Sequence, residues 1–107
     1  VAERLDREGI SVELIDLRTI APVDMEAVLA SVKKTGKLLI VHEAPRACGF
    51  GAELAARVGE EAFQYLDAPI QRLGGMDVPV PYCKDLENTV LPQPEGIEAA
   101  IRLLAAY

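Results

Sequence analysis

The run Leu38-Leu39-Ile40-Val41 decides the fold of this chain. Four consecutive apolar residues between polar neighbours are typical of a short strand that is buried on both faces, as in a parallel sheet. A stretch with helical periodicity precedes the run, and another one follows it. A strand between two helices is the repeating unit of an α/β protein, in which helices cover both faces of a mainly parallel sheet.

Helix signals lie on both sides of this run. Before it, Asp24 is well placed as an N-cap and Gly36 as a C-terminal glycine, so we predict a helix between them. After it, we predict one helix that begins near Phe50 and another that ends the chain. The apolar faces of these three helices consist of Met25, Val28, Leu29 and Val32; Leu54, Ala55 and Val58; and Ile97, Ala100, Ile101 and Leu104.

Two further stretches have strand patterns. Alternation of side chains over Ile10–Ile15 predicts a strand, and Ile70–Leu73 predicts a short one. The turn-rich stretch Gly74–Pro94 contains several prolines, so we predict that it has no regular structure. Val1–Gly9 has the pattern of the last turns of a helix, and we expect residues before it, because helices seldom begin a natural protein without a cap.

The composition argues against several classes of function. The 107 residues suffice for one domain with one core, and the apolar and charged fractions, 50% and 26%, are those of a globular protein. A net charge of −6 without a run of Lys and Arg argues against nucleic-acid binding and favours a basic partner. No apolar stretch approaches the roughly 20 residues of a membrane span. Cys48 and Cys83 are most simply free thiols of a reducing compartment.

The strongest catalytic candidate is His42, the only histidine, which follows the buried strand at the edge where α/β proteins place ligands. Glu43 could orient it as a general base, but neighbours on an extended segment point to opposite faces. Cys48 does not have the spacing of a nucleophile for this histidine, and one His with two distant Cys does not make a tetrahedral metal site. We therefore favour a loop or interface histidine and assign no catalytic, cofactor-binding or metal-binding residue.

Three loops allow more than one interpretation. Gly49-Phe50-Gly51 loosely resembles a phosphate loop, but it lacks the GxGxxG spacing and the Walker lysine. A tight turn with close backbone packing is the simpler interpretation, and an anion at the following helix N-terminus stays open. Asp67–Pro69 and Met76–Tyr82 are rigid, partly acidic loops that form either surface turns or a recognition surface.

Five motifs resemble those of one known family, in the same order and at fitting intervals. They are Asp16–Asp24, Val41–Pro45 with Gly49–Glu53, Tyr65–Pro69 with Arg72, Asp77–Tyr82, and Leu91–Pro92. Together they resemble the carboxy-terminal domain of the beta subunit of pyruvate dehydrogenase and its branched-chain relatives. Each motif is weak alone, but the set runs from about Gly9 to Tyr107 and is specific.

The resemblance implies one domain over residues 1–107, a three-layer α/β/α sandwich of the transketolase carboxy-terminal type with a mainly parallel sheet. The family domain begins earlier, so we expect its first strand to be lacking and this piece to be unstable alone. In the family, a preceding domain and the alpha subunit hold thiamine diphosphate and magnesium, so we expect no active site here. The whole assembly is expected to be an oxidoreductase that decarboxylates pyruvate or a branched-chain 2-oxo acid.

The resemblance also implies partners. The domain is expected to pack the alpha subunit and a second beta subunit into an α2β2 heterotetramer and to dock the peripheral subunit-binding domain of a dihydrolipoyl acyltransferase. Asp67 matches the family's acidic residue that pairs with a basic residue of that domain. Tyr107 matches the chain end, where the terminal carboxylate is a second anion. The expected location is the bacterial cytoplasm or, in a eukaryote, the mitochondrial matrix.

Two alternatives remain open. The chain could be the equivalent domain of another transketolase-like enzyme, such as transketolase or deoxyxylulose phosphate synthase. The stretches Leu66–Pro69 and Val80–Tyr82 favour the dehydrogenase. Within it, Val80–Tyr82 and Leu91–Pro92 lean towards pyruvate by similarity. A stand-alone catalytic or ligand-binding α/β protein would be favoured by a pocket that gathers His42, Glu43 and Cys48 on one wall.

Overall fold

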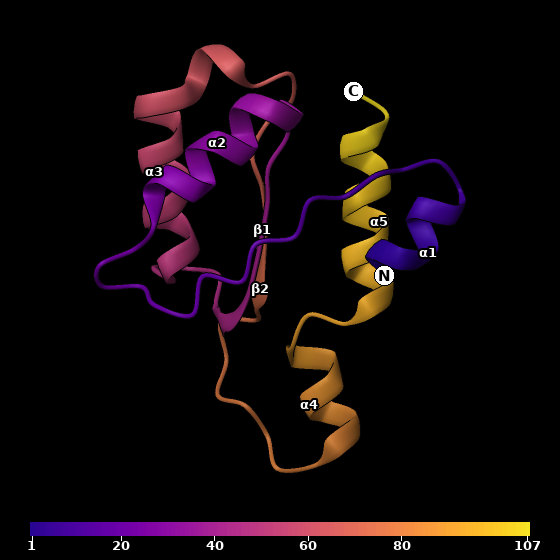
Figure 1. Cartoon of the computed structure of the whole chain (residues 1–107). Coiled ribbons are helices and arrows are strands. Elements are labelled where there is room, and N and C mark those ends of the chain that lie inside the picture. Colours follow the sequence, from indigo (N-terminus) through magenta and orange to yellow (C-terminus); the bar gives the residue numbers. More distant parts are fainter.

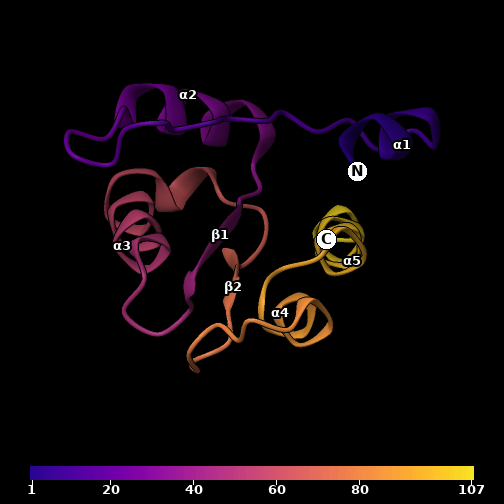
Figure 2. The same cartoon turned by 90° about the horizontal axis from the view of Figure 1, so that it is seen from below.

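Two parallel strands lie between helices in the computed structural model, which describes residues 1–107. The elements are α1 (Ala2–Arg7), α2 (Met25–Thr35), β1 (Leu39–Pro45), α3 (Phe50–Ala62), the 3-10 helix η1 (Phe63–Tyr65), β2 (Gln71–Gly75), α4 (Lys84–Val90) and α5 (Pro94–Ala105). In the sheet, Leu39 is opposite Gln71 and Val41 is opposite Leu73. Helix α3 lies on one face and α5 on the other (Figures 1 and 2). The predicted α/β class is therefore confirmed.

Helix α2 begins and ends where the sequence predicts. The side chain of Asp24 accepts a hydrogen bond of 3.0 Å from the backbone N–H of Ala27. Gly36 adopts the left-handed conformation with φ +70°, and its N–H donates to the carbonyl of Val32 at 2.8 Å. Both caps satisfy backbone groups that the helix itself leaves unpaired.

No helix of the structure has the length and apolar character needed to cross a membrane.

The main core lies between α2, α3 and β1. It consists of Met25, Val28, Val32, Ile40, Leu54, Val58 and Ala62. Five of these seven residues belong to the predicted apolar faces of α2 and α3, so the helical periodicity identified the buried side of both helices. Val58 and Val32 are at most 1% exposed, and burying each contributes roughly 1.5–2 kcal/mol.

The opposite face of the sheet is covered by α5, to which α1 is attached. Leu5 of α1 is fully buried. Around it, Arg102 of α5 forms ion pairs of 2.7 Å with both Glu8 and Glu98, and Arg4 pairs with Glu98 as well. One buried leucine and a surface ion-pair network therefore hold α1 against α5.

The predicted strand over Ile10–Ile15 is wrong. The segment contains no strand and makes no backbone hydrogen bond with β1. It runs beyond the β1 edge of the sheet, on the side away from β2 (Figure 2). Alternating side chains favour an extended backbone, but a strand forms only where a neighbour takes up its N–H and C=O groups.

Two loop predictions also need correction. His42, which the sequence favoured as a loop or interface residue after the strand, lies within β1, whose second half is His42–Pro45. The stretch Gly74–Pro94 is not wholly irregular, because it contains the helix α4. All of its prolines lie outside α4. Pro94 opens α5 at a position that tolerates proline.

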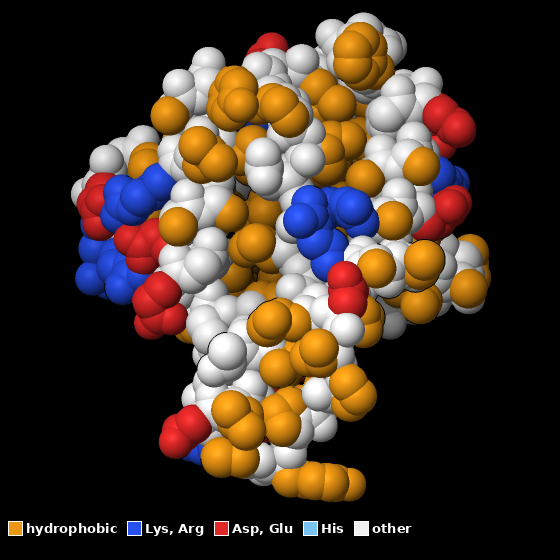
Figure 3. Space-filling view, turned by 180° about the vertical axis from the view of Figure 1, so that it is seen from behind, with side chains coloured by type: hydrophobic (Ala, Val, Ile, Leu, Met, Phe, Trp, Pro, Cys, Tyr) orange, Lys and Arg blue, Asp and Glu red, His pale blue; other side chains and the backbone are white.

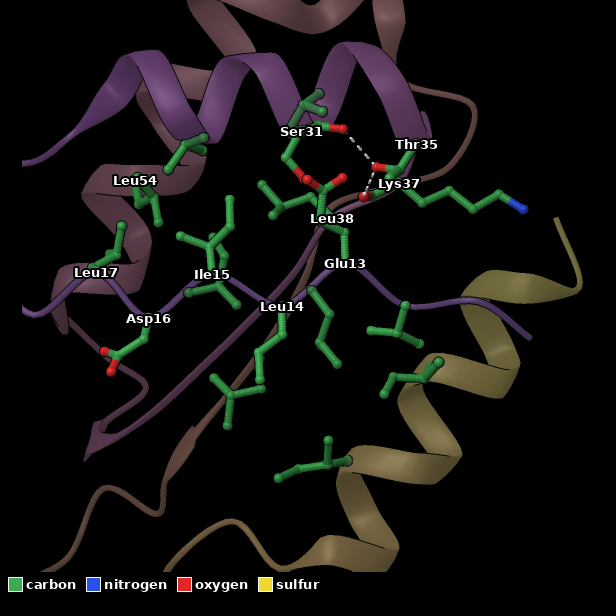
Figure 4. Close-up of a pocket in the computed structure, with 18 of the residues that line it drawn as sticks. Glu13, Leu14, Ile15, Asp16, Leu17, Ser31, Thr35, Lys37, Leu38 and Leu54 are labelled. Carbon is green, nitrogen blue, oxygen red and sulfur yellow. Dashed lines mark hydrogen bonds between the residues drawn. The ribbon is translucent and has the colours of Figure 1, made fainter. Parts of the chain in front are cut away.

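An apolar groove of about 680 Å³ separates the Ile10–Ile20 segment from β1. Its walls include Leu14, Leu17, Leu38 and Leu54, which are labelled in Figure 4. The groove lies along the edge of β1 that has no partner strand.

Candidate functional site

The candidate residues divide between the two ends of the sheet. Asp67 lies between η1 and β2, at the end where both strands begin. The C-terminus, Tyr107, lies at this same end (Figure 1). His42 and the turn into α3 lie towards the other end, where the strands finish. We call these the amino end and the carboxyl end of the sheet.

The backbone of Asp67 is held by the end of α2. Its N–H donates a hydrogen bond of 2.7 Å to the carbonyl of Gly36. The next residue, Ala68, is buried, and the N–H of Gln71 donates to the carbonyl of Leu38 at 3.0 Å. Asp67 therefore stands on a main chain that is fixed on both sides, although it lies in a connection between elements.

The carboxylate of Asp67, in contrast, is free. The residue is exposed, and its side chain takes part in no hydrogen bond or ion pair within the chain. Lys33, at the end of α2, lies over the ring of Tyr65 at 5.4 Å from the ring centroid. An exposed anion on a fixed backbone is suited to a cationic group of another molecule.

Tyr107 is likewise exposed, at 64%. Its N–H donates to the carbonyl of Leu104 at 3.3 Å, which keeps the last residue close to α5. The structure thus places both predicted partner-binding residues at the amino end of the sheet.

At the carboxyl end, the imidazole of His42 is enclosed by glycines. A Cβ atom on Gly51 would lie 2.6 Å from its Nε2, and one on Gly74 would lie 2.9 Å from its Cε1. The ring nitrogen Nδ1 is 2.9 Å from the carbonyl of Ala44, while Nε2 is buried without a hydrogen-bond partner. The ring therefore fills the space below the start of α3. The interpretation of Gly49–Gly51 as a closely packed turn is confirmed.

The structure does not bring the other catalytic candidates together with this histidine. Glu43 and Cys48 are exposed, and neither lines the groove that His42 borders. No group of three or more His, Cys, Asp or Glu side chains could hold a metal ion. The imidazole occupies the space beside the glycines at the start of α3, so these glycines do not form an open cradle.

One neighbour of Asp67 was missed by sequence reasoning. Gly36 was recognised only as the end of α2, yet its carbonyl holds the Asp67 backbone. The sequence did contain a signal that Gly36 and Asp67 lie close together, since each precedes a predicted strand. Consecutive parallel strands are commonly neighbours, so the residues that precede them meet at one edge of the sheet.

Comparison with known proteins identifies the family. The family model described as "Transketolase, C-terminal domain" matches residues 1–97. A beta subunit of the pyruvate dehydrogenase E1 component, mitochondrial, from Dictyostelium discoideum is 50% identical over 101 residues, which are 94% of this chain and 28% of that protein. The E1 beta subunit from Rhizobium meliloti is 48% identical, over 94% of this chain and 22% of its own length.

A branched-chain relative is almost as similar. The 2-oxoisovalerate dehydrogenase subunit beta from Pseudomonas aeruginosa is 47% identical over 97 residues, which cover 91% of this chain and 27% of that protein. The chain thus spans about a quarter of the length of these relatives.

Proposed function

Since the chain belongs to the family of transketolase C-terminal domains, we propose that it is the non-catalytic carboxy-terminal domain of a 2-oxo acid dehydrogenase beta subunit. The relatives act, by their names, on pyruvate or 2-oxoisovalerate, so the proposed assembly oxidises pyruvate or a branched-chain 2-oxo acid. Thiamine diphosphate would supply the decarboxylation chemistry, and the proposal places it outside these residues. The proposed location is the bacterial cytoplasm or the mitochondrial matrix.

The proposed task of the amino end is to dock the peripheral subunit-binding domain of a dihydrolipoyl acyltransferase. The observation that carries this proposal is the exposed, unpaired carboxylate of Asp67 on a fixed backbone. Where Tyr107 ends the chain, its carboxylate provides a second anion at the same end. The net charge of −6 adds long-range attraction for a basic partner, which mainly raises the association rate.

The second proposed task is subunit assembly into an α2β2 heterotetramer. The chain exposes 7257 Å², whereas a folded monomer of 11.6 kDa exposes about 5,800 Å², an excess of roughly 1,400 Å². Part of it belongs to a projection formed by α4 and the loop before it, where hydrophobic side chains gather (Figure 3). Its exposed apolar residues are Met76, Val78, Val80, Tyr82 and Leu86. We propose that this α4 projection packs against the alpha or the second beta subunit.

The docking proposal is tested by titrating the binding domain into the whole α2β2 assembly in a calorimeter. Asp67→Asn removes one charge with little change of shape. We expect it to weaken binding about tenfold, which corresponds to about 1.4 kcal/mol. Raising the salt concentration should weaken the unaltered assembly more than the variant, because screening acts on the lost charge.

Glu53→Gln is the matched control, because Glu53 is also exposed and forms no ion pair but lies in the first turn of α3, at the carboxyl end of the sheet. It should leave the dissociation constant unchanged. Equal affinities for unaltered protein and Asp67→Asn would overturn the docking assignment.

A further inference from the structure

We infer that Gly36 is a positioning residue for the carboxylate of Asp67, because its missing side chain provides the space in which that carboxylate lies. The inference rests on the docking role proposed for Asp67. It assigns Gly36 a second task besides ending α2.

The contacts between the two residues are close. The carbonyl of Gly36 accepts the N–H of Asp67 at 2.7 Å. A Cβ atom added to Gly36 would overlap Oδ2 of Asp67 and would lie 3.0 Å from its Cγ and 3.5 Å from the carbonyl oxygen of Tyr65. The carboxylate therefore packs directly against the bare α-carbon of Gly36.

Asp67 cannot move away as a whole to make room for a side chain at position 36. Its N–H is bound to Gly36, the following Ala68 is buried, and β2 begins soon after it. The remaining freedom is rotation of the Asp67 side chain into another staggered rotamer. Such a rotation keeps the charge but changes the direction in which it faces the partner.

This direction matters for recognition. An exposed carboxylate without an internal partner loses rotamer freedom when it binds a cation. The backbone of Gly36 lies against one side of the carboxylate and already restricts its rotamers. The entropy lost when the Asp67 side chain is ordered on binding is therefore smaller. Gly36 would thus contribute to affinity without touching the partner.

A left-handed glycine at a helix end is common for conformational reasons alone. The chain offers a matched control for this simpler explanation. Gly9 follows α1, also has a left-handed conformation with φ +87°, and has no atom within 4 Å of where a Cβ would be. Alanine at either position strains the backbone, but only alanine at position 36 meets Asp67.

The experiment measures binding of the isolated peripheral subunit-binding domain to the whole α2β2 assembly for Gly36→Ala, Gly9→Ala, Asp67→Ala and the double variant Gly36→Ala/Asp67→Ala. We expect Gly36→Ala to weaken binding about fivefold, less than removal of the charge, and Gly9→Ala to leave it unchanged. In the Asp67→Ala background, Gly36→Ala should have no further effect, because the carboxylate it displaces is gone.

The outcomes separate the two proposals. If Asp67→Ala weakens binding and Gly36→Ala does not, the positioning role is wrong and the docking role stands. An equal loss from Gly36→Ala with and without Asp67 would also overturn the positioning role. No effect of Asp67→Ala would overturn the docking role itself. If Gly36→Ala fails to fold, Gly36→Asn replaces it, since Asn tolerates the left-handed conformation but still carries a Cβ.

Discussion

At each end of the sheet, glycines lie beside an ionisable side chain. The side chain is enclosed at one end and exposed at the other. At the carboxyl end, Gly49, Gly51 and Gly74 enclose the imidazole of His42. At the amino end, Gly36 supports the carboxylate of Asp67 from one side and leaves it exposed. The enclosed ring serves packing, and the free carboxylate can serve a partner. A position at the carboxyl ends of parallel strands therefore does not by itself indicate a functional site. The side chain must also be accessible to another molecule.

We expect the largest effect from expressing residues 1–107 alone, because this affects the sheet to which both ends belong. Residues 1–107 expressed alone should aggregate or lack a cooperative melt, because the groove along β1 and side chains such as Leu14, 82% exposed, leave apolar surface and a strand edge uncovered. Calorimetry and size-exclusion chromatography check this. A soluble monomer that melts cooperatively would contradict it.

The next effect concerns the carboxyl end alone. Gly51→Val should destabilise the assembly by about 3 kcal/mol, because the new side chain meets both His42 and Ile40 in a filled space. Thermal melting of the assembly measures this change. Gly59→Val, at a helical position of α3 with open space around it, is the control and should cost less than about 1 kcal/mol.

A second substitution sharpens this result. His42→Ala should restore part of the stability of Gly51→Val, because it empties the space that the valine needs. Neither carboxyl-end variant should alter the affinity for the binding domain, provided that the assembly is folded. Additive losses from the two substitutions would show that the ring and the glycine do not share one space.

Much of the fold was predictable, since local signals are sufficient for α2, α3 and α5. The caps Asp24 and Gly36 fixed both ends of α2, and the apolar periodicity identified the core. Ile10–Ile15 was not predictable in this way, because strand formation depends on a pairing partner that the segment itself does not encode. Helix α4 was not predicted, because the prolines on both sides of it indicated that the whole stretch is irregular.

The candidate site was less predictable than the fold. Asp67 came from the resemblance to a family, since one exposed aspartate in a loop has no distinguishing pattern. Its closeness to Gly36 depends on the parallel pairing of β1 with β2, which brings together residues far apart in the sequence. The enclosure of the His42 ring by the glycines around the start of α3 was not indicated by any motif.

The most direct test of the central claim is amide hydrogen exchange of the α2β2 assembly with and without the peripheral subunit-binding domain. It compares the two ends of the sheet in one measurement. We expect slower exchange in residues 64–70 and 104–107 and no change in residues 46–51. Slower exchange in residues 46–51, with residues 64–70 unaffected, would contradict the assignment of docking to the amino end.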